Sequence, residues 1–207
     1  MHALAAGDRL PVTQDEFEAW CLGPDGPECG HFEFLFGCVV AEPPAAWPHG
    51  EVSGTLALRI ANFVRRRRLG HFFDASQGFA LPSGDTLEPD AAVVLRATWD
   101  AAPAPVPGRF LRVVPDLVVE VLSPRTERRD RGPKRDLYER NGVREYWLVD
   151  PRRREVAVLT LGTDDRYAPA HEHHGTDMAR SQILGGFAVR VCDLFPPSPA
   201  RRPVGRR

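Results

Sequence analysis

Residues 115–124 read Pro115-Asp116-Leu117-Val118-Val119-Glu120-Val121-Leu122-Ser123-Pro124. A run so rich in valine and leucine is typical of a strand that is buried on both faces. Glu120 interrupts the run, and a carboxylate is costly to bury unless it is paired or bound to a metal. Side chains alternate along a strand, so Asp116 and Glu120, four residues apart, face the same side. The stretch therefore predicts a central strand with a polar site on one face.

The size and composition of the chain set the outer limits. It has 207 residues, of which 43% are hydrophobic, and a formal net charge of −1 at pH 7. We expect residues 1–195 to form a single domain and the Pro- and Arg-rich residues 196–207 to form a disordered tail. A nearly neutral chain has no overall field that would attract nucleic acid or an acidic membrane. Without CxxC spacing, a secretory h-region or 18 consecutive apolar residues, the sequence predicts a cytoplasmic protein with reduced thiols and no membrane partner.

Three features predict the N-terminal part of the fold. Thr13 and Glu16 form a capping box that predicts a short helix. Residues 31–40 predict a hairpin that bends near Gly37. Apolar side chains recur at spacings of three and four over residues 49–69, which predicts a longer amphipathic helix.

The rest of the sequence predicts a mixed sheet. Strands are expected over residues 71–81, 87–95, 117–122 and 145–149, with a helix over residues 130–141. Two further strands, over residues 155–161 and 187–191, are expected to extend the sheet, with the histidine-rich residues 171–174 as a loop between them. After the long helix the order is therefore strand, strand, strand, helix, strand, which indicates an α/β fold.

Three carboxylates are expected on neighbouring strands of this sheet. Pro89 and Asp90 open one strand as Pro115 and Asp116 open another, and Glu120 lies further along the second. Each Pro-Asp pair alone has a structural explanation, because proline fits the first residue of a strand and aspartate caps its end. Together, however, the three acids repel one another unless a cation is present. Mg²⁺ or Mn²⁺ would bind such oxygens and could activate a water that attacks a phosphodiester.

Lys134 is the only lysine among the 27 lysine and arginine residues of the chain. It lies near the start of the helix that follows the Glu120 strand. Where arginine is so dominant, a retained lysine indicates a need for a compact ammonium group, although a single lysine can also occur by chance. Lys134 is therefore a candidate to orient a water or to neutralise developing charge.

Four segments carry a family resemblance. They are residues 115–124, Arg129-Asp130-Arg131-Gly132-Pro133-Lys134, Leu137-Tyr138, and Asn141-Gly142-Val143-Arg144-Glu145-Tyr146-Trp147-Leu148-Val149-Asp150. These segments closely resemble the Uma2 family of bacterial restriction-endonuclease-like proteins, and a looser match extends over residues 12–195. The resemblance implies the PD-(D/E)XK nuclease fold, an α/β fold with a mixed sheet. Its core has the order helix-strand-strand-strand-helix-strand, here with an N-terminal helix and hairpin and extra C-terminal strands.

The resemblance also implies an endonuclease that uses Mg²⁺ or Mn²⁺ to hydrolyse phosphodiester bonds, with DNA as the expected partner. Asp90 resembles the aspartate of the family's first acidic motif, and Glu120 resembles the acid of the second; both would bind the metal. Leu122 stands where a lysine normally follows the second acid, and Lys134 on the next helix resembles a migrated replacement. Asp116 is expected to be a third acid and metal ligand.

Three further residues are candidates for the site. Glu33 lies in the hairpin, and Glu51 and His49 lie at the start of the long helix. His49 fits either a phosphate contact or a helix cap. Phe36 stands where the family tends to have an aspartate. Nucleases that cut both strands often pair two active sites, so by analogy a homodimer is expected.

Other interpretations remain open. The chain could be a non-catalytic nucleic-acid-binding or regulatory protein that keeps the nuclease scaffold, because a fold does not establish an activity. Glu120 could instead form a buried pair with an arginine, for which the candidates are Arg59, Arg112 and Arg144. Two weaker metal-binding sets are Cys21, Cys29, His31 and Cys38, whose spacing fits no compact zinc finger, and His171, His173 and His174, which a polar loop would leave solvated.

Overall fold

The computed structural model describes residues 11–24, 26–27, 30–42 and 44–197. The predicted tail at residues 196–207 lies outside the described residues except for its first two, and Cys29 also lies outside them.

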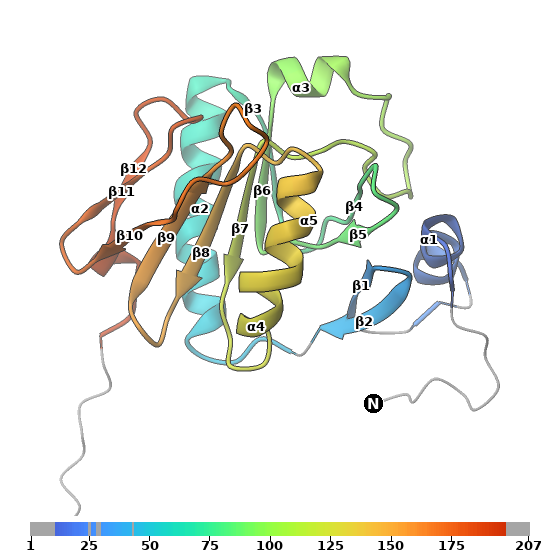
Figure 1. Ribbon diagram of the computed structural model, residues 1–207, viewed down its shortest axis with the longest axis horizontal. Helices are drawn as coiled ribbons and strands as arrows, with labels where there is room; N and C mark the ends of the chain where they lie inside the picture. The colour runs from blue at the N-terminus through green and yellow to red at the C-terminus, as the bar shows by residue number, and fades with distance from the viewer. Residues whose placement is uncertain (1–10, 25, 28–29, 43, 198–207) are drawn as a thin grey trace, which may run out of the picture.

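A six-stranded mixed sheet forms the centre of the molecule (Figure 1). Its strands lie in the order β10-β9-β8-β7-β6-β3, and β7 and β8 are its one parallel pair among the described residues. The strands are β3 (Gly70–Asp74), β6 (Ala91–Leu95), β7 (Leu117–Val121), β8 (Glu145–Asp150), β9 (Glu155–Thr160) and β10 (His171–His174). A parallel pair needs a crossover connection, and the helical segment of residues 127–140 supplies it.

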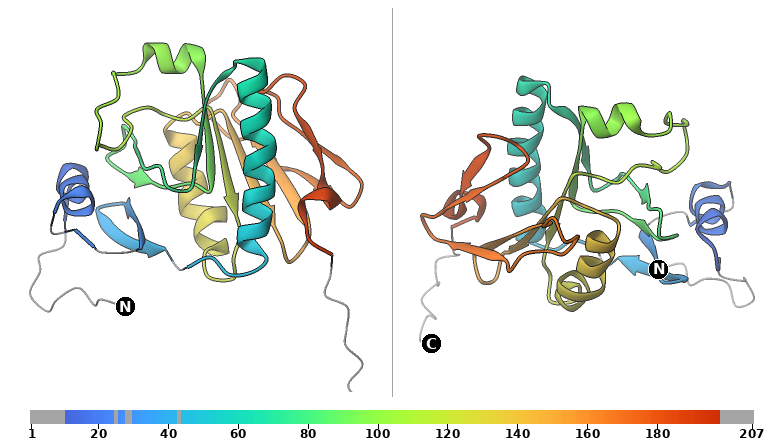
Figure 2. Two further views of the ribbon diagram at one scale, coloured as in Figure 1. Left: turned by 180° about the vertical axis from the view of Figure 1, so that it is seen from behind. Right: turned by 45° about the horizontal axis from the view of Figure 1, so that its top comes forward.

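Helices cover both faces of this sheet (Figure 2). On one face lies α2 (His49–Arg67), and on the other lie α4 (Glu127–Arg129), the π-helical turn η1 (Asp130–Lys134) and α5 (Arg135–Arg140). The side chains of β7 alternate between the two cores, with Val119 in the α2 core and Val118 in the α5 core. Coverage of both faces explains why the sequence of β7 is almost continuously apolar.

A smaller sheet, in the order β2-β1-β5-β4, lies on the N-terminal side. Its strands are β1 (His31–Leu35), β2 (Cys38–Glu42), β4 (Phe79–Ala80) and β5 (Thr86–Leu87). The helix α1 (Gln14–Leu22) begins as predicted, because the Thr13 side chain accepts a hydrogen bond from the Glu16 backbone N–H. Phe17 of α1 stacks on Phe34 of β1 with ring centroids 5.4 Å apart. This contact fixes the hairpin that carries Glu33.

Several predicted details of the sheet are wrong. Residues 171–174 form the edge strand β10 and not a loop, because an exposed strand of polar side chains has no apolar alternation to reveal it. Within residues 187–191, strand β12 (Ala188–Arg190) pairs with β11 (Met178–Arg180) in a separate sheet and does not extend the central one. The predicted strands over residues 71–81 and 87–95 each divide in two, since β4 and β5 belong to the small sheet.

The predicted fold class, a mixed α/β protein, is confirmed. A short helix that the sequence did not predict, α3 (Arg96–Ala101), follows β6. Among the described residues, no helix has both the length and the apolar character needed to cross a membrane.

Candidate active site

Glu120 lies in the middle of the central sheet and is 5% exposed. Its side chain faces α5, where the Tyr138 hydroxyl donates a hydrogen bond of 2.8 Å to Oε1. The Lys134 ammonium lies 2.5 Å from the same oxygen. The acid that interrupts the apolar strand is therefore paired with the one lysine of the chain.

Lys134 is held between two acids from different parts of the fold. It ends the π-helical turn η1 and is 1% exposed. Its Nζ also lies 2.9 Å from Oε1 of Glu33, which the β1 strand supplies. Burial disfavours its charge, but the carboxylates of Glu120 and Glu33 outweigh burial and hold the pKa of Lys134 well above its ordinary value. Lys134 is therefore charged and joins the hairpin to the central sheet.

Asp90 lies next to Glu120 across two paired strands. β6 and β7 are antiparallel with Ala91 opposite Val119, so the residue before Ala91 lies beside the residue after Val119. Asp90 Oδ2 accepts a hydrogen bond of 2.7 Å from the backbone N–H of Val121. Asp90 also lines a cleft of about 610 Å³ beside the first half of α2. Asp90 is thus an acid beside Glu120 that an approaching ligand can reach.

His49 begins α2 and lies beside Asp90. Its Nε2 is 3.4 Å from Asp90 Oδ2, and this hydrogen-bonding contact raises the pKa of His49. The other ring nitrogen, Nδ1, is buried without a hydrogen-bond partner among the described residues. The structure therefore brings His49 to the acids.

The cluster formed by Glu33, Asp90, Glu120, Asp130 and Lys134 holds more carboxylates than cations. Burial raises the pKa of Glu120 well above its ordinary value; Lys134 opposes this, while Asp130, Asp90 and Glu33 raise it further. Burial also raises the pKa of Asp130, which is 2% exposed. This excess of negative charge in a buried place is the main electrostatic feature of the site.

The acids of the cluster fit a hard divalent cation. All the donors are carboxylate oxygens, which Mg²⁺ and Mn²⁺ prefer. Glu33 Oε2 is buried and has no hydrogen-bond partner among the described residues. In the described part of the chain, no three of these acids have oxygens that all lie within 4.8 Å of one another. Lys134 Nζ contacts two of the acids, Glu120 and Glu33. An additional positive charge would relieve the repulsion between them.

Comparison with known proteins identifies the family of the chain. The model of the family Uma2, described as "Putative restriction endonuclease", matches residues 14–192. The chain belongs to the Uma2 family.

Among solved structures, this Uma2 protein is similar to the crystal structure of "a putative nuclease belonging to DUF820" from Anabaena variabilis. The TM-score is 0.70 at 17% sequence identity, and the match covers 89% of this chain and 97% of the other. At this identity the likeness shows a shared fold. No curated protein matches the chain.

Not every predicted site residue of this Uma2 protein joins the cluster. Asp116 faces the same side as Glu120, but four residues of strand separate the two by about 13 Å. Its carboxylate accepts hydrogen bonds from the Leu95 backbone N–H at 2.7 Å, from Thr98 at 3.0 Å and from Arg144 at 3.2 Å. Asp116 therefore fastens the far end of β6, and we do not propose it as a metal ligand.

The other candidates divide in the same way. Glu33 joins the cluster, whereas Glu51 lies exposed on the first turn of α2 and accepts a hydrogen bond from Trp47 Nε1 at 3.0 Å. The arginine partners considered for Glu120 pair elsewhere. Arg59 donates to the carbonyl of Asp193, Arg112 pairs with Asp15 and Glu18, and Arg144 pairs with Asp116. The hypothesis of a buried arginine partner is therefore wrong.

Two members of the cluster were not named as site residues by the sequence. Asp130 lies in an arginine-rich segment that looks like a solvated surface, and Tyr138 looks like an ordinary core residue. A usable signal was present, because residues four apart share one side of a helix. Asp130, Lys134 and Tyr138 are spaced by four, so one helical side carries an acid, the lysine and a hydroxyl.

The raised pKa of Glu33 predicts how stability depends on pH. Burial raises the pKa of Glu33 to about 7 from an ordinary 4.5. Between these values the folded protein binds more protons than the unfolded chain, so a rise in pH favours unfolding. From about pH 5 to about pH 8, we expect the free energy of unfolding to fall by up to about 3 kcal/mol, as urea denaturation would measure. The Glu33→Gln variant should have a smaller slope than the Glu51→Gln control, in which the raised pKa of Glu33 remains; equal slopes in both variants would contradict the assignment.

Proposed function

We propose that this Uma2 protein is a metal-dependent endonuclease that hydrolyses phosphodiester bonds in DNA with Mg²⁺ or Mn²⁺. The observation that carries this proposal is the placement of Lys134 against Glu120, with Asp90 immediately before the adjacent strand β6. Three different segments, the residue before β6, strand β7 and the turn η1, contribute one residue each to one place in the fold. Lys134 pairs with two of the acids, and Asp90 and Asp130 add carboxylates that this pairing does not use.

Each residue has a specific task in this proposal. Asp90 and Glu120 would hold the metal ion, which supplies a water of lowered pKa and polarises a phosphoryl oxygen. Lys134 would stabilise the negative charge that develops on the phosphate, because its ammonium is fixed and desolvated. The Tyr138 hydroxyl fixes the orientation of Glu120. Glu33 also pairs with Lys134 and helps to hold it in place.

The test is cleavage of supercoiled plasmid DNA by the full-length protein. We expect nicking that requires Mg²⁺ or Mn²⁺ and stops when EDTA removes the ion. DNA binding without cleavage in either ion would favour the non-catalytic alternative and would contradict the proposed activity.

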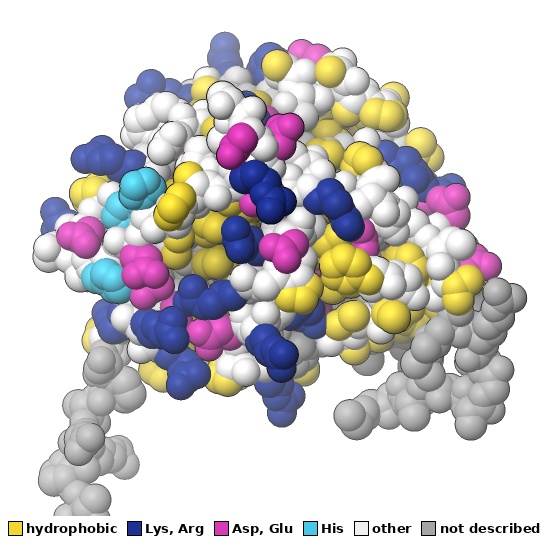
Figure 3. All heavy atoms as spheres, in the orientation of Figure 1, with side chains coloured by type: hydrophobic (Ala, Val, Ile, Leu, Met, Phe, Trp, Pro, Cys, Tyr) yellow, Lys and Arg dark blue, Asp and Glu magenta, His cyan; other side chains and the backbone are white. Residues whose placement is uncertain are grey.

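A basic rim beside the site supports DNA as the partner. We define this rim as Arg125, Arg128 and Arg152, three exposed arginines whose side chains make no ion pair or hydrogen bond with the described residues. The first two follow β7 at the end where Glu120 lies, and the third lies in the turn between β8 and β9. Arg153 of this turn contacts Glu127 of α4 at 3.6 Å, which keeps the two segments together. In Figure 3, drawn in the orientation of Figure 1, Lys and Arg side chains gather over the lower part of the molecule, where α4 and the turn between β8 and β9 lie.

The rim predicts a salt-dependent contribution to DNA binding. Replacing its three arginines by alanine should weaken DNA binding at least tenfold and lower the slope of log affinity against log salt by up to about 3, because each phosphate contact contributes about 0.9. Fluorescence anisotropy with a labelled duplex, over a range of salt concentrations, measures both. The matched control replaces Arg65, Arg66 and Arg67 by alanine. This removes the same charge at the opposite end of α2. An equal loss in both triple variants would contradict a role specific to the rim.

A further inference from the structure

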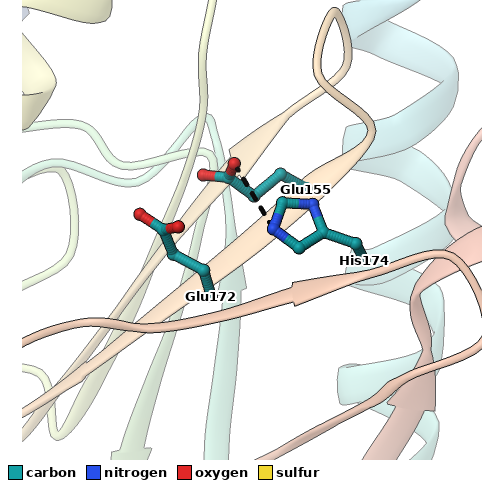
Figure 4. Close-up of side chains that lie close together, drawn as sticks. All are labelled: Glu155, Glu172 and His174. Carbon is teal, nitrogen blue, oxygen red and sulfur yellow. Dashed lines mark ion pairs between the residues drawn. The ribbon is translucent and has the colours of Figure 1, made fainter.

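A second group of ligand-type side chains lies away from the candidate active site, where β9 pairs with the edge strand β10. Glu155 comes from β9, and Glu172 and His174 come from β10. One ligand atom from each residue lies within 4.8 Å of the other two, and this is the only such trio of His, Cys, Asp or Glu in the described ranges of the chain. Figure 4 shows the carboxylate of Glu172 and the ring of His174 turned toward Glu155.

The strand pairing explains why these three side chains meet. His174 is directly opposite Glu155 in the antiparallel pair, and Glu172 is opposite the residue two positions further along β9. Residues two apart on a strand point to the same side, so Glu172 and His174 both face Glu155. A hydrogen bond of 2.9 Å from the His174 backbone N–H to Asp177 fixes the end of β10. The trio is therefore set by backbone register.

The state of the Glu155 carboxylate points to a ligand. Glu155 is 5% exposed, yet its carboxylate accepts no hydrogen bond from the described residues. Its charged neighbours are Arg131 Nη2, 3.7 Å from Oε1, and His174 Nε2, 3.9 Å from Oε2, both beyond hydrogen-bonding distance. Arg131 is also held by Glu127 at 3.2 Å and Asp150 at 3.5 Å, so it is shared among three acids. With charged neighbours only at these distances, the Glu155 oxygens can coordinate a cation, which would stabilise this nearly buried carboxylate.

We propose that Glu155, Glu172 and His174 form a binding site for a divalent transition-metal ion of the Zn²⁺ class. One imidazole nitrogen and two carboxylate oxygens form a ligand set that Zn²⁺ accepts, whereas Mg²⁺ prefers oxygen alone. Ligands of a tetrahedral Zn²⁺ lie roughly 3.3 Å apart, given bonds of about 2.0–2.2 Å. The exposed side chains of Glu172 and His174 can close the remaining distance by rotation. The ion would fasten the edge strand to the central sheet and leave one coordination position for water.

Isothermal titration of the full-length protein with ZnCl₂ tests this site. The matched control is His171, a histidine of the same strand whose side chain lies on the opposite side. Measurements use the Glu120→Gln background, so that the candidate active site does not contribute. We expect one Zn²⁺ site whose affinity falls at least tenfold in His174→Ala and is unchanged in His171→Ala.

Two results would overturn the site. One is equal Zn²⁺ affinity in His174→Ala and His171→Ala, and the other is no Zn²⁺ binding by the Glu120→Gln protein. A second substitution, Glu172→Gln, should also weaken Zn²⁺ binding, and because Glu172 is exposed this variant is expected to fold. None of these outcomes depends on the proposed DNA cleavage.

Discussion

Replacing Lys134 by methionine should lower the free energy of unfolding by about 3–5 kcal/mol, the usual cost of removing one partner from a buried ion pair. Lys134 contacts Glu120 and Glu33, and all three side chains are buried. Methionine keeps much of the side-chain volume but no charge, so it leaves both carboxylates without their cation. Urea denaturation measures the loss.

A second substitution separates this electrostatic cause from a packing defect. In the double variant Lys134→Met with Glu120→Gln, one of the two stranded charges is gone, and we expect a substantial part of the lost stability to return. The control is Arg153→Met, which removes an exposed cation from its ion pairs with Glu127 and with the buried Asp150, and Asp150 keeps its contact with Arg131. Such pairs contribute about 0–1 kcal/mol. A loss of this small size in Lys134→Met, or no recovery in the double variant, would contradict the charge arrangement.

The central strand could be predicted from the sequence because its apolar composition indicates burial and its single acid needs a buried partner. Glu120 is buried, as the surrounding valines imply, and it has the cation that its burial demands. The rarity of lysine in the chain pointed to Lys134 before any distance was known. Local pattern sufficed here because strand and helix follow one another closely along the chain.

Asp116 shows where the same reasoning stops. Alternation along a strand predicts which face a side chain occupies but not its position along the strand axis, and two residues on one face can lie at opposite ends. Asp116 is buried and satisfied by hydrogen bonds to Leu95, Thr98 and Arg144. Its sequence neighbourhood resembles that of Asp90, yet only Asp90 lies at the end of the sheet that also holds Lys134.

Strand β10 shows a different limit. Its sequence, His171-Glu172-His173-His174, has no apolar side chain, and its pairing with β9 depends on backbone hydrogen bonds at the edge of an already formed sheet. A tertiary partner, not local propensity, decides its conformation. The histidines that a loop would leave solvated are thereby aligned, and His174 is brought opposite Glu155.

Glu120→Gln should reduce the rate of metal-dependent DNA cleavage at least about 100-fold, which corresponds to a loss of about 2.7 kcal/mol of transition-state stabilisation. Glutamine keeps the shape of the side chain but loses the charge that would hold the ion. Since the pKa of Glu120 is already raised by burial, a neutral side chain should be tolerated and the variant should remain folded. Glu51→Gln is the matched control, because it makes the same chemical change outside the cluster.

The initial rate of supercoiled plasmid cleavage in Mg²⁺ or Mn²⁺, compared between the wild type, Glu120→Gln and Glu51→Gln purified in parallel, tests the central claim most directly. We predict cleavage by the wild type and by Glu51→Gln, and at least a hundredfold lower rate with Glu120→Gln. Equal rates for all three proteins would show that Glu120 takes no part in catalysis and would contradict the proposed site.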